Sequence, residues 1–128
     1  MADRMSGNKG EWSELYAFLK LLSQGRIYAA NEKVERIDDV YYPILKIIRE
    51  EYADSKYEYV INDDCVSVIV ENACILKVPR KELEEQANYL LNQIATHSNS
   101  FEIEEVAKFA NGIKVTKIKA PSRCSISL

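Results

Sequence analysis

The sequence predicts an α+β fold with about four helices and a small, mainly antiparallel sheet; α/β is the alternative. Apolar residues recur at helical spacing near the start of the chain and again in its second half. Between these segments lie runs rich in β-branched and aromatic residues, separated by short turn-forming clusters. The 128 residues, 47% hydrophobic and 29% charged, are typical of a single globular domain, which we place at residues 1–128.

The first helix is expected between Asn8 and Gly25. Asn8 and Glu11 have the spacing of a capping box, and Gly25 stands where a helix would end. The apolar residues between them have the spacing of a helix with one buried face: Trp12, Leu15, Tyr16, Leu19 and Leu22. A short hairpin or an irregular loop is expected next, with its turn at Asn31-Glu32-Lys33.

A second helix is expected over residues 38–52. Asp38 and Asp39 would begin it, Pro43 would lie in its first turn, and apolar residues recur at helical spacing as far as Tyr52. The next segments have the composition of a three-stranded meander. Its strands would be residues 57–61, 65–70 and 73–78, joined by two turn-forming clusters.

A third helix is expected from Pro79 to about His97, because apolar residues at helical spacing are interspersed there with glutamates and asparagines. Asn99 and Glu102 repeat the capping-box spacing before a short fourth helix, which would end at Asn111-Gly112. Residues 113–119 then have the composition of a strand, and residues 120–128 show no continuing pattern.

Composition and motif content exclude several classes of protein. No apolar run approaches the roughly 20 residues that cross a bilayer, and the start lacks a secretory signal, so we expect a cytoplasmic protein without membrane contact. Three cysteines without CxxC spacing predict neither a disulfide framework nor a zinc site. The phosphate-loop, dinucleotide, zinc-protease and hydrolase motifs are absent.

The net charge of −3 conceals a basic segment at the end of the chain. Residues 106–128 contain no Asp or Glu and carry five cations: Lys108, Lys114, Lys117, Lys119 and Arg123. Such a strip could bind the phosphates of a nucleic acid. It could equally keep an exposed sheet edge from pairing with another chain.

Acidic pairs and the single histidine are the other candidates for chemistry. Mg²⁺ needs carboxylates that converge from different elements, so Asp38-Asp39 and Asp63-Asp64 are expected to cap a helix and to solvate a turn. Glu14 stands out because it lies in an otherwise apolar helix, although a solvated helix face also accounts for it. His97 is expected to cap a helix end.

Four stretches resemble HpaII-type restriction endonucleases. They begin with Gly-Asn-Lys-Gly-Glu-Trp-Ser-Glu and cover residues 7–22, 25–30, 41–50 and 117–123. The resemblance implies a Mg²⁺-dependent type II endonuclease that cleaves double-stranded DNA at CCGG, with the PD-(D/E)XK nuclease architecture. It also implies a metal bound by an Asp and an Asp/Glu-x-Lys pair. Glu14 matches the position of a helix carboxylate that can join this catalytic set.

The chain departs from this family near its end. Family members are more than twice as long, no acidic residue follows Glu105, and Pro121-Ser122 stands where Pro-Asp is expected. We therefore expect an N-terminal domain or truncated form that is not catalytic alone and has no metal or cofactor of its own. Its contribution would be to dimerisation, to bracing of the nuclease, or to DNA binding through Lys114, Lys117, Lys119 and Arg123.

Two alternatives remain open. The acidic net charge and the eight tyrosines also fit a protein-interaction or dimerisation module without a nucleic-acid role. An active nuclease would have to use Glu14 with Asp63 or Asp64 in place of the missing pair. That arrangement requires the carboxylates to lie within a few ångströms of one another.

Overall fold

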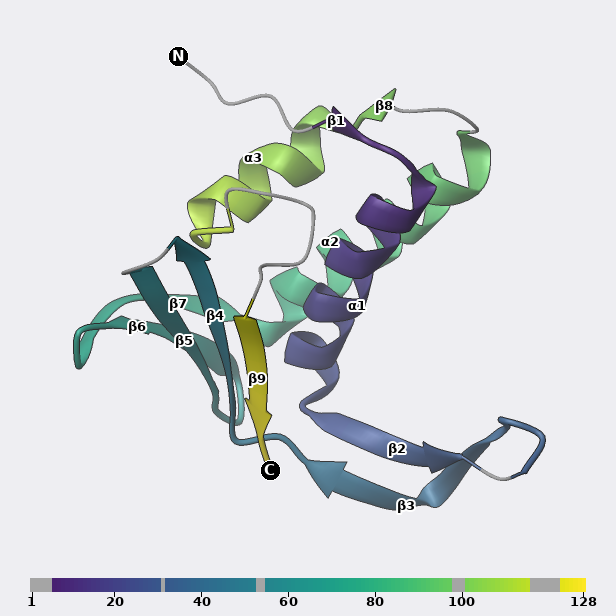
Figure 1. Ribbon diagram of the computed structural model, residues 1–128, viewed down its shortest axis with the longest axis horizontal. Helices are drawn as coiled ribbons and strands as arrows, with labels where there is room; N and C mark the ends of the chain where they lie inside the picture. The colour runs from purple at the N-terminus through teal and green to yellow at the C-terminus, as the bar shows by residue number, and fades with distance from the viewer. Residues whose placement is uncertain (1–5, 31, 53–54, 98–100, 116–122) are drawn as a thin grey trace.

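The computed structural model describes residues 6–30, 32–52, 55–97, 101–115 and 123–128. These residues form three helices and three antiparallel sheets, which confirms the α+β prediction with one helix fewer than expected. A five-stranded sheet lies beside helices α1 and α2, and a two-stranded arm extends from the foot of α1 (Figure 1). None of the helices in the described part of the chain is both long and apolar enough to cross a membrane.

Helix α1 (Lys9–Gln24) forms as its end signals predict. The backbone N–H of Glu11 donates to Oδ1 of Asn8 at 2.9 Å, and the N–H of Asn8 donates to the Glu11 carboxylate at 3.2 Å. At the other end Gly25 adopts φ 71°, and its N–H donates to the Leu21 carbonyl at 2.8 Å. The helix buries one face: Trp12, Leu15, Phe18, Leu19 and Leu22.

Strands β2 (Arg26–Ala30) and β3 (Arg36–Pro43) pair only with each other and form a hairpin that we call the β2–β3 arm. Its register shifts between Tyr28, which lies opposite Tyr41, and Ala29, which lies opposite Ile37. The expected hairpin is thus present, and its second strand is longer than the sequence predicted. Figure 1 shows the arm projecting from the body of the molecule.

The main sheet has the strand order β7-β6-β5-β4-β9, with every neighbouring pair antiparallel. Its central meander matches the predicted one. The strands are β4 (Lys46–Tyr52), β5 (Ser55–Ile61), β6 (Cys65–Val70), β7 (Ala73–Pro79) and β9 (Arg123–Ser127).

Helix α2 (Arg80–Thr96) begins directly after Pro79, as predicted, and packs along α1. Helix α3 (Glu104–Gly112) follows, and a short ladder of β1 (Ser6–Gly7) with β8 (Phe101–Glu102) lies beside it. The largest fully buried side chains come from α1, α2, α3, the sheet and the segment after α3: Trp12, Tyr59, Leu15, Leu19, Leu22, Ile47, Leu83, Leu90, Val66, Val68, Val106 and Val115. The helices and the sheet therefore share one core.

The helix predicted over residues 38–52 is wrong, because this segment contributes to β3 and β4. Along β4 the side chains of Ile47 and Arg49 are buried, while Lys46 and Ile48 on the opposite face are half-buried. Arg49 conceals this alternation because it is a charged residue on the core side, with its guanidinium 4.6 Å from the centre of the Phe18 ring. Pairing with β5 and β9 then decides the conformation.

The strand predicted from residue 113 is also wrong where the structure describes it. Residues 113–115 close the end of α3, and residues 116–119 lie outside the described part of the chain. The strand lies further along, in a segment that showed no pattern. There Ile126 pairs with Ile47, and the Ser127 carbonyl accepts a hydrogen bond from the Leu45 N–H at 2.8 Å.

Candidate nucleic-acid interface

Lys114 is the residue of the proposed DNA-binding set whose whole placement the structure describes. It follows α3 with φ 70°, a left-handed conformation that glycine usually supplies. Its N–H donates to the Asn111 carbonyl at 3.1 Å, and the Val115 N–H donates to the Ala110 carbonyl at 2.8 Å. This pair of bonds is a Schellman motif, so α3 ends at Gly112, as expected, with its C-cap at Ile113.

The backbone that carries Lys114 is fixed on both sides. Ile113 is 3% exposed and Val115 is fully buried. The Tyr59 hydroxyl, from the middle of the sheet, donates to the Ile113 carbonyl at 2.8 Å. The Lys114 side chain itself is exposed, so the fold fixes the point on the surface from which this cationic side chain extends.

The other cations of the predicted strip are described to different extents. Lys108 is exposed on α3, and Arg123 begins β9, with its Cα opposite that of Glu50. Lys117, Lys119 and the side chain of Arg123 lie outside the described part of the chain. Strand β9 forms an edge of the five-stranded sheet as far as the chain is described, so the edge-protection alternative remains for these cations.

Glu14, the candidate catalytic carboxylate, is an exposed residue of the second turn of α1. Asp63 lies near the opposite end of this helix, since Arg80 donates hydrogen bonds to the carbonyls of both Ser23 and Asp63. Nine helical residues separate Glu14 from Ser23, which is about 14 Å. The structure therefore does not bring Glu14 together with the Asp63-Asp64 pair, as the active-nuclease alternative requires.

His97 ends α2, where a helix-capping role was expected. Its Nδ1 lies 2.7 Å from the Gln93 carbonyl oxygen, which can only accept, so Nδ1 carries the proton of this hydrogen bond. The ring stacks on Phe101, with 4.6 Å between ring centres, and Phe101 in turn stacks on Trp12. These contacts give His97 a packing and capping role.

Comparison with known proteins decides the family. A sequence model of the HpaII restriction endonuclease family matches residues 8–126. The chain belongs to this family. It is 34% identical over 127 residues to the type II restriction enzyme HpaII of Haemophilus parainfluenzae. The match covers 95% of the chain and 34% of that enzyme, so the chain spans about a third of the relative's length. No solved structure matches it.

Membership of the HpaII family brings Mg²⁺ into consideration, because a restriction endonuclease generally needs it. The described His, Cys, Asp and Glu side chains include no group of three or more that could hold a metal ion. The acidic residues in this part of the chain therefore do not fit a Mg²⁺ site.

The structure of this HpaII-family chain brings together a group of basic and aromatic residues that the sequence did not predict as a site. Arg26 and Arg36 lie on the β2–β3 arm, each with its guanidinium over a tyrosine ring. In the sequence, this group is indicated only by Arg26 and Tyr28, which stand two residues apart in the first strand of the expected hairpin. The helix that the sequence predicts over residues 38–52 conceals the position of Tyr41, which lies opposite Tyr28 in the structure.

Proposed function

We propose that this chain is the DNA-binding part of an HpaII-type restriction endonuclease and is not catalytic by itself. The observation that carries the proposal is the family match over nearly the whole chain. The relative named as a type II restriction enzyme is about three times as long, which leaves room there for catalytic residues beyond the matched region. We expect the protein to act in the cytoplasm, where its DNA substrate is.

The basic strip of Lys114, Lys117, Lys119 and Arg123 is our proposed contact with double-stranded DNA. Support comes from Lys114, whose exposed ammonium group is held on a rigid backbone beside buried residues. Lysine binds phosphate as a point charge, which positions a protein on the duplex without reading the sequence. Glu14 stays a proposed contributor to a catalytic set whose other members the described residues do not provide.

The test is binding and cleavage of a CCGG duplex and of a scrambled duplex of equal length, at low salt. Fluorescence anisotropy measures binding, and a denaturing gel measures cleavage with and without Mg²⁺. We expect both duplexes to bind, because phosphate contacts dominate affinity. We expect neither to be cleaved.

Each other outcome contradicts a defined part of the proposal. Cleavage at CCGG with Mg²⁺ would show a complete active site in this chain. No binding to either duplex, together with a salt-insensitive dimer in sedimentation, would favour the protein-interaction alternative. That alternative has its own support, since large apolar residues are exposed on and beside the arm: Val34, Val40, Tyr41, Tyr42 and Leu45.

A further inference from the structure

The β2–β3 arm carries an ordered row of cationic and aromatic side chains that the proposed phosphate contacts do not use. The Arg36 Cζ lies 3.7 Å from the centre of the Tyr28 ring, and the Arg26 Cζ lies 4.2 Å from the centre of the Tyr41 ring. The two rings are 6.0 Å apart, centre to centre. The row therefore runs Arg36, Tyr28, Tyr41, Arg26.

Strand register explains why the four side chains share one face. Tyr28 lies opposite Tyr41, and Ala30, two residues further along β2, lies opposite Arg36. Arg26 lies two residues from Tyr28 in the other direction. Since side chains alternate between the faces of a strand, these positions fall on the same side of the ribbon.

Stacking prepares the guanidinium groups for a polar partner. A guanidinium over a ring is attracted to the ring face, and this contact restricts the freedom of the long side chain. The donors of arginine match the paired acceptors of a phosphate or of the O6 and N7 atoms of guanine. The row thus holds two cations in conformations suited to nucleic acid.

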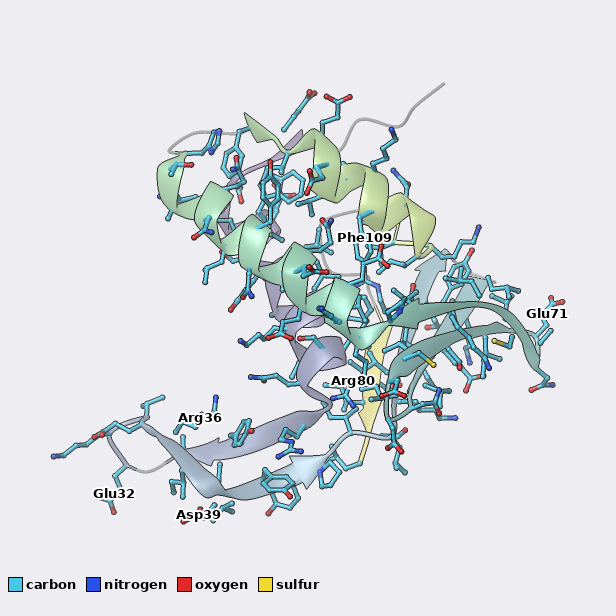
Figure 2. All side chains as sticks on the ribbon, turned by 180° about the vertical axis from the view of Figure 1, so that it is seen from behind. Glu32, Arg36, Asp39, Glu71, Arg80 and Phe109 are labelled. Carbon is cyan, nitrogen blue, oxygen red and sulfur yellow. The ribbon has the colours of Figure 1, made fainter. Side chains whose placement is uncertain are left out.

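Two oppositely charged residues of β3 lie on different sides of the arm. Figure 2 shows Arg36 on one side of the ribbon and Asp39 on the other, with Glu32 near the tip. Asp39 falls in the segment of β3 between Ile37 and Tyr41, where the register shift leaves residues without a paired neighbour in β2. Arg26 and Arg36 thus place two cations on one face of the arm, which favours contact with a polyanion.

The shape of the arm, a two-stranded ribbon, suits a DNA groove. A two-stranded ribbon can enter the major groove, which is about 12 Å wide. Arg26 and the position opposite Arg36 are four residues apart on β2, about 13 Å along the strand. We propose, on the basis of the DNA-binding function above, that the arm inserts its Arg26–Arg36 face into the major groove of duplex DNA.

The test compares the full chain with the double variant Arg26→Ala/Arg36→Ala, using anisotropy with CCGG and scrambled duplexes over a range of salt concentrations. We expect CCGG binding to weaken about tenfold or more. The salt slope should fall by about 0.9 for each lost phosphate contact. Arg26→Lys/Arg36→Lys keeps both charges and should bind with intermediate affinity, because lysine lacks the planar fork.

A matched control is Lys77→Ala/Lys81→Ala, which also removes two cations. Both residues are exposed, and both lie outside the arm and the basic strip. The control should bind DNA nearly as well as the wild-type chain. Far-UV circular dichroism and a melting curve establish that each variant is folded. If the alanine variant is unfolded, the binding test uses Arg26→Lys/Arg36→Lys instead.

The outcomes separate this inference from the function on which it rests. If the wild-type chain binds no duplex, the proposed function fails, and the arm contact fails with it. If the wild-type chain binds and the arm variants bind equally well, the arm contact alone is overturned. The arm contact with DNA would also be overturned if the wild-type chain is a dimer and the Arg26→Ala/Arg36→Ala variant is a monomer. The arm would then be a contact with a second copy of this chain.

Discussion

At the scale of single residues, Lys114 combines two roles that substitutions can separate. Its backbone completes the Schellman motif of α3, and its side chain extends the basic strip. A non-glycine residue at φ 70° is strained because its Cβ approaches the following carbonyl. The backbone conformation at this position therefore favours glycine, whereas only arginine could replace the lysine and keep its positive charge.

Replacing Lys114 tests these roles separately. Lys114→Gly should raise the free energy of unfolding by roughly 0.5–1 kcal/mol, because strain is removed while unfolded-chain entropy increases. Lys114→Ala keeps the strained φ and should leave stability within roughly 0.5 kcal/mol of the wild type. Both variants should weaken DNA binding alike. Urea denaturation and anisotropy measure the two effects, and weaker binding by only one variant would contradict the assignment of charge as the cause.

Single residues also explain where the candidate site could be predicted. Charge counting alone located the basic strip, because its cations are close together in sequence. The pairing of Arg36 with Tyr28 is a contact across two strands, so no spacing along one segment reveals it. Lys114 was placed in a strand because Gly112 is the expected stop signal, whereas the left-handed residue is the lysine two positions later.

At the scale of elements, local signals were sufficient for α1, α2 and the β5–β6–β7 meander, each of which was predicted close to its observed bounds. They were not sufficient for the start of α3, which begins at Glu104 without a side-chain cap, while Glu102 of the expected capping box lies in β8. Strands β4 and β9 depend on pairing with a segment more than 70 residues away in sequence. Because Arg49 is a charged residue on the buried face, the sequence of β4 has no local pattern that distinguishes a strand from a helix.

Arg80 joins three elements at the foot of α1, as Figure 2 shows by its position between the helices and the sheet. Its guanidinium donates to the carbonyls of Ser23 and Gln24 at the end of α1, and to those of Asn62 and Asp63 in the β5–β6 turn. A Cβ added to Gly25 would lie 2.7 Å from its Nη2 atom. The end of α1, the start of α2 and the sheet are therefore coupled.

A double-mutant cycle tests this coupling. Arg80→Ala should lower the free energy of unfolding by about 2–3 kcal/mol, because charge-assisted hydrogen bonds to otherwise orphaned helix carbonyls are lost. Gly25→Ala should lower it by about 1–2 kcal/mol through its positive φ and the approach of Arg80. Urea denaturation of the double variant should show a smaller loss than the sum, since the steric conflict disappears with Arg80. Additive losses would show that the two residues act independently.

At the scale of the whole molecule, α1, α2, α3 and the five-stranded sheet form one body, and the arm extends from it (Figure 1). Lys114 lies at the end of α3, and the arm begins after Gly25 at the end of α1. The two proposed DNA contacts thus come from different parts of the fold. The family could be predicted from long matching stretches of sequence, whereas the register of the arm and its arginine–tyrosine contacts depend on the pairing of two strands.

The salt dependence of DNA binding tests the central claim most directly, namely that this chain binds duplex DNA through its basic strip. Anisotropy titrations of a CCGG duplex should give a falling log–log plot, with a slope that Lys117→Ala/Lys119→Ala makes shallower by about 1.8, or 0.9 for each phosphate contact. The control Lys77→Ala/Lys81→Ala should keep the wild-type slope. Absence of binding at low salt, or equal slopes for all three proteins, would contradict the account.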